Sequence, residues 1–167
     1  MEINTRTAVG LLSATALGWS AITGAITALG HDKGHHNGTT LFRSTLAPTV
    51  LTDPPIHGVA RGGVPWMLDR GSTRLRHGGR LTVGVRGLVI PGNGTPGPVT
   101  SITASLYCGA DATPAVATTG SVPLSSQGDA RIDEHITLPA KCLAPIVLVH
   151  PNGNPAAYIA ASGFEQS

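Results

Sequence analysis

The sequence predicts an all-β fold, an antiparallel β-sandwich of about eight strands that follows an N-terminal export signal. From Thr39 to Phe164 the apolar residues recur with a period of two, in short runs that glycine, proline and asparagine interrupt. No apolar stripe with a period of 3.6 residues extends beyond two turns, so no long amphipathic helix is expected. Turn signals separate the runs at the spacing typical of a sandwich.

Residues 1–30 have the pattern of a secretory signal peptide. A basic residue, Arg6, precedes a long apolar run that ends in small residues. Cleavage is expected after Gly30, with cuts after Ala25 or Ala28 as alternatives. The run is also long enough to remain as an uncleaved membrane anchor. Once the signal is removed, we expect no membrane span and a protein that is secreted or held at the cell surface.

The 137 residues that remain after cleavage are enough for one domain with a buried core. Charged residues make up 12% of the full chain and the formal net charge is +2, which disfavours both a disordered acidic tail and a strongly basic nucleic-acid binder. Aromatic residues make up only 4%, so the stacking platforms of single-stranded nucleic-acid sites are scarce. No nucleic-acid partner is expected.

Residues 31–38, HDKGHHNG, are expected to form a flexible histidine-rich leader before a folded domain at 39–167. If cleavage follows Gly30, the amine and imidazole of His31 could chelate copper, with His35 and His36 as further ligands. A cut after Ala28 would instead leave an N-terminal X-X-His tripeptide, which also chelates Cu(II) or Ni(II). A tether without fixed geometry is the simpler interpretation, so no cofactor is expected and copper is the alternative.

Eight runs are expected to form strands, and they are listed here in chain order: Leu41–Leu46, Ser72–Arg76, Arg80–Ile90, Val99–Cys108, Ala115–Val122, Ala130–Leu138, Ile146–His150 and Ala156–Ser162. The run from Ile146 to Val149 is apolar on both faces, which is typical of a central strand covered on two sides.

The hairpin around Gly78 and Gly79 allows a prediction of register, because loop length decides which residues face each other. A three-residue loop, His77–Gly79, places Leu75 opposite Leu81, whereas a two-residue loop would mix charge into the apolar face. The pattern therefore predicts the longer loop. The outer face would then carry a basic stripe, a candidate surface for an anionic partner, formed by Arg74, Arg76, Arg80 and Arg86.

Cys108 and Cys142 are the only cysteines, and an even count in an exported chain favours a disulfide over two free thiols. Catalytic motifs with a known spacing are absent, so the protein is expected not to be an enzyme. In the tripeptide Asp133-Glu134-His135, the first and third side chains share one strand face while Glu134 takes the other, which implies a bulge or a position at the sheet edge.

Three segments carry a resemblance to known proteins: Gly71–Leu88 (GSTRLRHGGRLTVGVRGL), Ser101–Gly109 (SITASLYCG) and Tyr158–Ala160. With them, the stretch from Leu41 to Phe164 resembles small secreted actinobacterial β-domain proteins and is distantly similar to chordin-repeat-type (CHRD) domains. The resemblance implies an extracellular β domain. It implies no site residue, because the histidine that such domains often carry would fall around Ala104–Cys108, where this chain has none.

Two functions follow from these patterns. The first is a non-enzymatic exported module with a binding or structural role at the cell surface, whose partner would be an anionic cell-envelope polymer or a protein. The alternative is a secreted copper-binding protein organised around His31.

Overall fold

The structure is a computed structural model and describes residues 38–110 and 112–165. Every regular element in these residues is a β-strand, which confirms the all-β class. The predicted signal segment lies outside the described residues, and so do His31, His35 and His36 of the leader. Within the described ranges, no helix is long and apolar enough to cross a membrane.

Eleven strands are present in this part of the chain: β1 (Thr40–Pro48), β2 (Ala60–Arg61), β3 (Arg70–Arg76), β4 (Arg80–Arg86), β5 (Ser101–Tyr107), β6 (Ala117–Thr118), β7 (Val122–Pro123), β8 (Ala130–His135), β9 (Ile146–Pro151), β10 (Ala157–Tyr158) and β11 (Ala160–Ser162). Each of the eight predicted runs overlaps at least one of them, and β1, β3 and β9 extend beyond the predicted bounds. The short strand β2 was not predicted.

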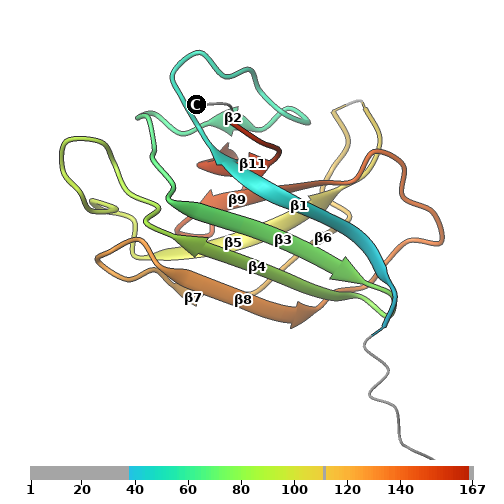
Figure 1. Ribbon diagram of the computed structural model, residues 1–167. Helices are drawn as coiled ribbons and strands as arrows, with labels where there is room; N and C mark the ends of the chain where they lie inside the picture. The colour runs from blue at the N-terminus through green and yellow to red at the C-terminus, as the bar shows by residue number, and fades with distance from the viewer. Residues whose placement is uncertain (1–37, 111, 166–167) are drawn as a thin grey trace, which may run out of the picture. The chain divides into compact units, whose positions relative to one another are not determined.

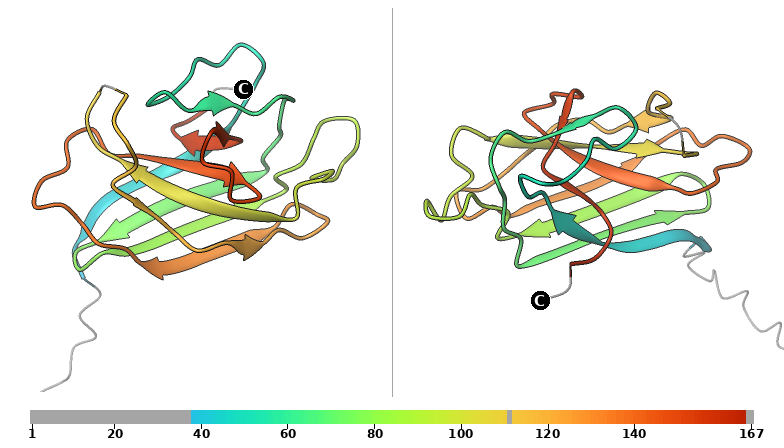
Figure 2. Two further views of the ribbon diagram at one scale, coloured as in Figure 1. Left: turned by 180° about the vertical axis from the view of Figure 1, so that it is seen from behind. Right: turned by 90° about the horizontal axis from the view of Figure 1, so that it is seen from above.

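Nine of the strands form one antiparallel sheet in the order β6-β5-β9-β11-β1-β3-β4-β8, with β7 pairing to β5 outside this path. The sheet curls into a half-barrel, so that β1, β3, β4 and β8 form one layer and β5, β9 and β11 lie behind them (Figure 1). The two layers are also seen from above in Figure 2. The remaining two strands, β2 and β10, pair in parallel.

The predicted sandwich of two separate sheets differs from this arrangement, because β1 belongs to both layers. Its first part, Thr40–Thr45, pairs with β3, and its last part, Leu46–Pro48, pairs with β11. A strand of nine residues is long enough to continue from one layer into the other. The layers are therefore two halves of one sheet rather than two sheets packed face to face.

The main hydrophobic core lies between the layers and confirms the period-two pattern. Both layers contribute residues that are almost completely buried, among them Leu81, Val83, Val85, Ile102, Ala104, Leu106, Val147 and Val149. Their outward neighbours in β4 are polar residues or glycine. Burial of these aliphatic side chains supplies the main favourable term in folding.

A second, smaller core covers the outer side of the β5–β9 layer. Leu148 is fully buried there against Val59, Tyr107 and Tyr158. This confirms that β9 is covered on both faces. The Tyr158 hydroxyl donates a hydrogen bond of 2.7 Å to the Pro54 carbonyl, which fixes the segment between β1 and β2 over this side. Within the residues that the structure describes, no segment covers the outer side of the β1–β3–β4–β8 layer (Figure 1).

Two local predictions are confirmed. Cys108 and Cys142 form a disulfide with their Cα atoms 5.2 Å apart, which joins the end of β5 to the segment before β9. In the β3–β4 hairpin, Leu75 lies opposite Leu81 across a three-residue loop. The loop requires Gly79, whose φ is 88°, because a Cβ there would lie 2.1 Å from the Ile136 carbonyl oxygen.

Candidate functional site: an arginine face

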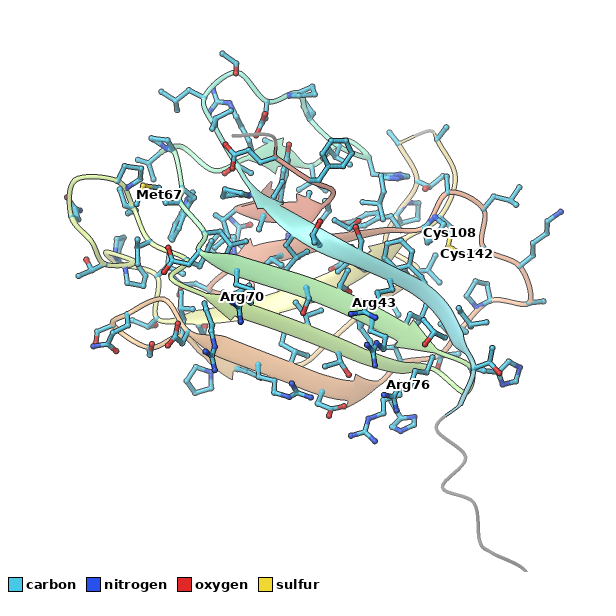
Figure 3. All side chains as sticks on the ribbon, in the orientation of Figure 1. Arg43, Met67, Arg70, Arg76, Cys108 and Cys142 are labelled. Carbon is cyan, nitrogen blue, oxygen red and sulfur yellow. A yellow bond between two sulfur atoms is a disulfide. The ribbon has the colours of Figure 1, made fainter. Side chains whose placement is uncertain are left out.

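The outer side of the β1–β3–β4–β8 layer gathers most of the basic residues of the chain. Side chains alternate along a strand, so the outward positions of the four strands share one surface. Seven of the 11 lysine and arginine residues lie on it: Arg43, Arg70, Arg74, Arg76, Arg80, Arg86 and Arg131. We call this surface the arginine face. Figure 3 shows Arg43, Arg70 and Arg76 on it.

The strand register arranges the arginine face in four rows that cross the strands. The first row is Arg70 and Arg86, the second is Thr45, Ser72, Gly84 and Arg131, the third is Arg43, Arg74, Thr82 and Asp133, and the fourth is Arg76, Arg80 and His135. Every row therefore contains at least one arginine.

The four arginines of the predicted basic stripe all lie on this face, and the structure adds three that sequence reasoning missed. Arg70 lies two residues before Ser72, so it continues the outward alternation of β3 toward the N-terminus and could have been found from that spacing. Arg43 and Arg131 come from β1 and β8, which lie far from the hairpin in sequence. Only strand pairing places them beside it.

Two pairs of arginines face each other directly across neighbouring strands. Arg43 lies opposite Arg74, and Arg70 lies opposite Arg86. Such partners have their Cβ atoms roughly 4.5–5.5 Å apart, and like charges in these positions destabilise a sheet. Within the described residues, none of these four side chains makes a hydrogen bond or an ion pair. Their positive charges are therefore not neutralised by the fold.

One carboxylate, Asp133, is an integral part of the rows and neutralises one corner of the face. It accepts two hydrogen bonds of 2.7 Å from the Arg80 guanidinium and lies 3.8 Å from Arg131. The hydrogen bonds from Arg80 lower the pKa of the Asp133 carboxyl below its ordinary value. Its neighbour Glu134 points to the other side of β8 and accepts a hydrogen bond of 2.8 Å from the Gly120 N–H, which the position of β8 at the end of the sheet allows.

Two adjacent hollows indent the arginine face where small residues lie between the arginines. The first spans rows one and two, with Ser72 and Gly84 between Arg70, Arg86 and Arg131. The second spans rows two to four around Thr82, and the two hollows share Ser72 and Arg131. Asp129 lies at the rim of the first hollow, where its carboxylate accepts a hydrogen bond of 3.0 Å from the Gly87 N–H.

The arginine face carries almost no apolar surface. Of the large hydrophobic side chains that are exposed in the described residues, Leu41 alone belongs to these four strands, and it lies at the irregularity near the start of β1. The other outward residues are serine, threonine, glycine, histidine and aspartate. The face therefore offers guanidinium and hydroxyl donors without aromatic or aliphatic contacts.

The histidines of the described residues form no metal site. No group of three or more histidine, cysteine or acidic side chains that could hold a metal occurs there. His150 is fully buried, and its Nδ1 lies 2.7 Å from the Ala157 carbonyl oxygen. His135 is exposed on the opposite layer, 3.3 Å from the Gly78 carbonyl oxygen. The copper hypothesis concerns residues 31–36 and stays a prediction.

A further hollow lies on the other layer, next to the end of β5. The ring of His57 stacks on Tyr107 with the ring centroids 5.0 Å apart. His57 has a φ of 49°, which is uncommon for a residue with a side chain. Among the residues that the structure describes, no lysine, arginine, aspartate or glutamate lines this hollow.

No protein-family model matches this chain, and neither a curated protein nor a solved structure is significantly similar to it. The resemblance to CHRD domains therefore stays a prediction.

Proposed function

We propose that this protein is an exported, non-enzymatic binding module whose arginine face holds an anionic polymer. The observation that supports this most strongly is the pair of cross-strand arginine contacts, Arg43 with Arg74 and Arg70 with Arg86. Like charges in these positions destabilise the sheet. Destabilising arrangements of this kind are expected in proteins at functional surfaces. A bound polyanion would remove the repulsion.

The composition of the face favours a polar polymer over other anionic partners. The core of a protein–protein interface is usually rich in aromatic side chains and methionine, which the arginine face lacks. A membrane-binding surface inserts apolar side chains, and a single-stranded nucleic acid stacks its bases on aromatic rings. Guanidinium groups alone are sufficient for a chain of oxyanions, because their N–H donors match carboxylate and phosphate geometry.

Export is supported by the signal pattern of residues 1–30 and by the disulfide, which persists in oxidising compartments. The groups on the face bind and orient oxyanions, and the proposal includes no catalytic step.

Two double variants with the same net charge test the proposal. Arg70→Ala/Arg86→Ala removes the first row of the face, whereas Arg61→Ala/Lys141→Ala removes two positive charges outside it. We expect the first variant to bind a soluble polyanion such as polyphosphate at least tenfold more weakly, with a smaller slope of log K against log salt by roughly one per arginine. The control should stay close to wild type. Equal losses of affinity in both variants would mean that binding depends on the net charge of the protein and not on the arginine face.

A gain of affinity is also expected, because Asp133 is the carboxylate within the rows. Asp133→Asn releases Arg80 and removes a negative charge, so it should strengthen polyanion binding. Asp53→Asn, which changes the net charge equally but lies in the loop after β1, is the control. Weaker binding by Asp133→Asn would contradict the proposal.

A further inference from the structure

On the basis of the proposed function, we propose that the two hollows form one trough that holds a linear phosphate polymer. The polymer would run along β3 and β4, with successive phosphates at successive rows. The hollows share Ser72 and Arg131, so together they are continuous from the first row to the fourth. The bound polymer would therefore lie parallel to the strands.

The spacing of the rows sets the spacing of the anionic groups. Outward residues of a strand follow each other at about 6.7 Å, and the first and fourth rows are about 20 Å apart. Each row supplies an arginine: the second row does so through Arg131, which lies beside Gly84. A flexible chain with a short repeat, carrying one phosphate per repeat, fits this spacing.

The floor of the trough supplies a second kind of donor. The hydroxyl groups of Ser72 and Thr82 lie between the arginines and can each donate one hydrogen bond. The arginines form the walls of the trough. The oxygens of a tetrahedral phosphate point in several directions, so one can accept a hydrogen bond from a guanidinium at the wall while another accepts one from a hydroxyl at the floor. A carboxylate, with two oxygens in one plane, satisfies these two directions less well.

Gly84 indicates that the trough is kept open for a ligand. Its φ is not in the left-handed region, and a Cβ there would meet only the Ser72 Oγ, at 3.9 Å. Neither the backbone nor the packing therefore requires glycine. Glycine inside a strand weakens the strand and often marks a bulge, a tight bend or a site that a ligand or another backbone approaches closely. The β3–β4 and β4–β8 registers run through Gly84 without a shift, so no bulge accounts for it.

Two properties of the face distinguish a phosphate chain from other polyanions. The rows contain no phenylalanine, tyrosine, tryptophan or large aliphatic side chain to pack against the ring of a sulfated sugar. A membrane surface presents its headgroups in a plane, so it would contact the arginine tips without using the floor. Only a narrow chain uses the floor donors and the walls together.

Inorganic polyphosphates of defined length test the trough. For the wild-type chain we expect affinity to rise from phosphate through pyrophosphate and tripolyphosphate, and to keep rising until the chain is long enough to span the four rows. Neighbouring phosphates of inorganic polyphosphate lie closer together than neighbouring rows do, and each added group binds intramolecularly. Gly84→Val fills the floor without changing charge and suits a strand. It should weaken binding of the longer chains by about tenfold while thermal unfolding shows an intact fold. Gly63→Val, which adds the same side chain at an exposed turn, should bind as wild type does.

The outcomes separate the trough from the proposed function. If heparin or polyglutamate binds as tightly as polyphosphate and Gly84→Val has no effect, the arginine face still binds polyanions but the trough is refuted. If anionic lipid vesicles bind and polyphosphate does not, the occupant is a membrane and the inference is wrong. If none of these probes binds, the proposed function fails as well.

Discussion

Two buried threonines show how one hydroxyl group can raise or lower stability at the scale of a residue. Thr73 is 1% exposed and its Oγ1 has no hydrogen-bond partner among the described residues. The Thr119 Oγ1, in contrast, accepts a hydrogen bond from the Ala104 N–H and donates one to the Gly120 carbonyl. A buried hydroxyl without a partner costs stability because it has lost its bonds to water.

We therefore expect opposite effects from the same substitution at these two positions. Thr73→Val should raise the free energy of unfolding by about 1 kcal/mol, and Thr119→Val should lower it by about 1–3 kcal/mol. Urea unfolding of both variants measures the difference. A loss at Thr73 as large as that at Thr119 would show that the Thr73 hydroxyl is bonded.

His150 predicts a loss of stability in mild acid. Burial lowers the pKa of its imidazole below the ordinary value of 6.5, and the hydrogen bond to the Ala157 carbonyl opposes this. The unfolded chain therefore binds a proton at a higher pH than the folded protein does. The contribution of the neutral His150 imidazole to the free energy of unfolding should be fully present above pH 6.5. It should decrease as the pH falls from there toward the folded-state pKa.

Urea unfolding at a series of pH values between 7.5 and 5, with the His150→Leu variant beside wild type, measures this effect. The variant should lose the pH dependence in that range even if its stability at neutral pH differs, and His135→Ala should keep it. An NMR titration in which the His150 imidazole takes up its proton at or above pH 6.5 would refute the assignment.

At the scale of elements, the sequence predicts best where the interactions are local. The β3–β4 register follows from a three-residue loop and two apolar positions, Leu75 and Leu81. The predicted strand from Arg80 to Ile90 ends at Arg86, because Gly87 has a φ of 64° and turns the chain. Strands of two residues, such as β2, are too short to show a period and depend on partners far away in the chain.

The disulfide joins two elements of the fold, and the loss of stability on its removal can be calculated. It closes a loop with a sequence separation of 34 residues, and the chain-entropy model assigns such a link roughly 3–4 kcal/mol. The oxidised chain should unfold at a correspondingly higher urea concentration than the reduced chain or the Cys108→Ala/Cys142→Ala variant. Equal midpoints would mean that the link contributes nothing to stability.

At the scale of the whole domain, several features depend on pairing between strands that are distant in the sequence, and these could not be predicted from local patterns. The period-two pattern predicts two layers around one core, yet it does not show that β1 continues from one layer into the other. For the same reason the basic stripe could be predicted on the hairpin, while the contribution of Arg43 and Arg131 could not. The burial of His150 likewise depends on the covering of β9 by distant segments.

The central claim is that the arginine face, and no other surface, binds a polyanion. Backbone amide NMR of the isotope-labelled chain, titrated with polyphosphate, tests this most directly. We expect the largest shift changes at the outward residues of β3 and β4, above all Ser72, Thr82 and Gly84, with little change around Leu148 and Tyr158. Shift changes concentrated around His57 and Tyr107, or none at saturating polyphosphate, would contradict the account.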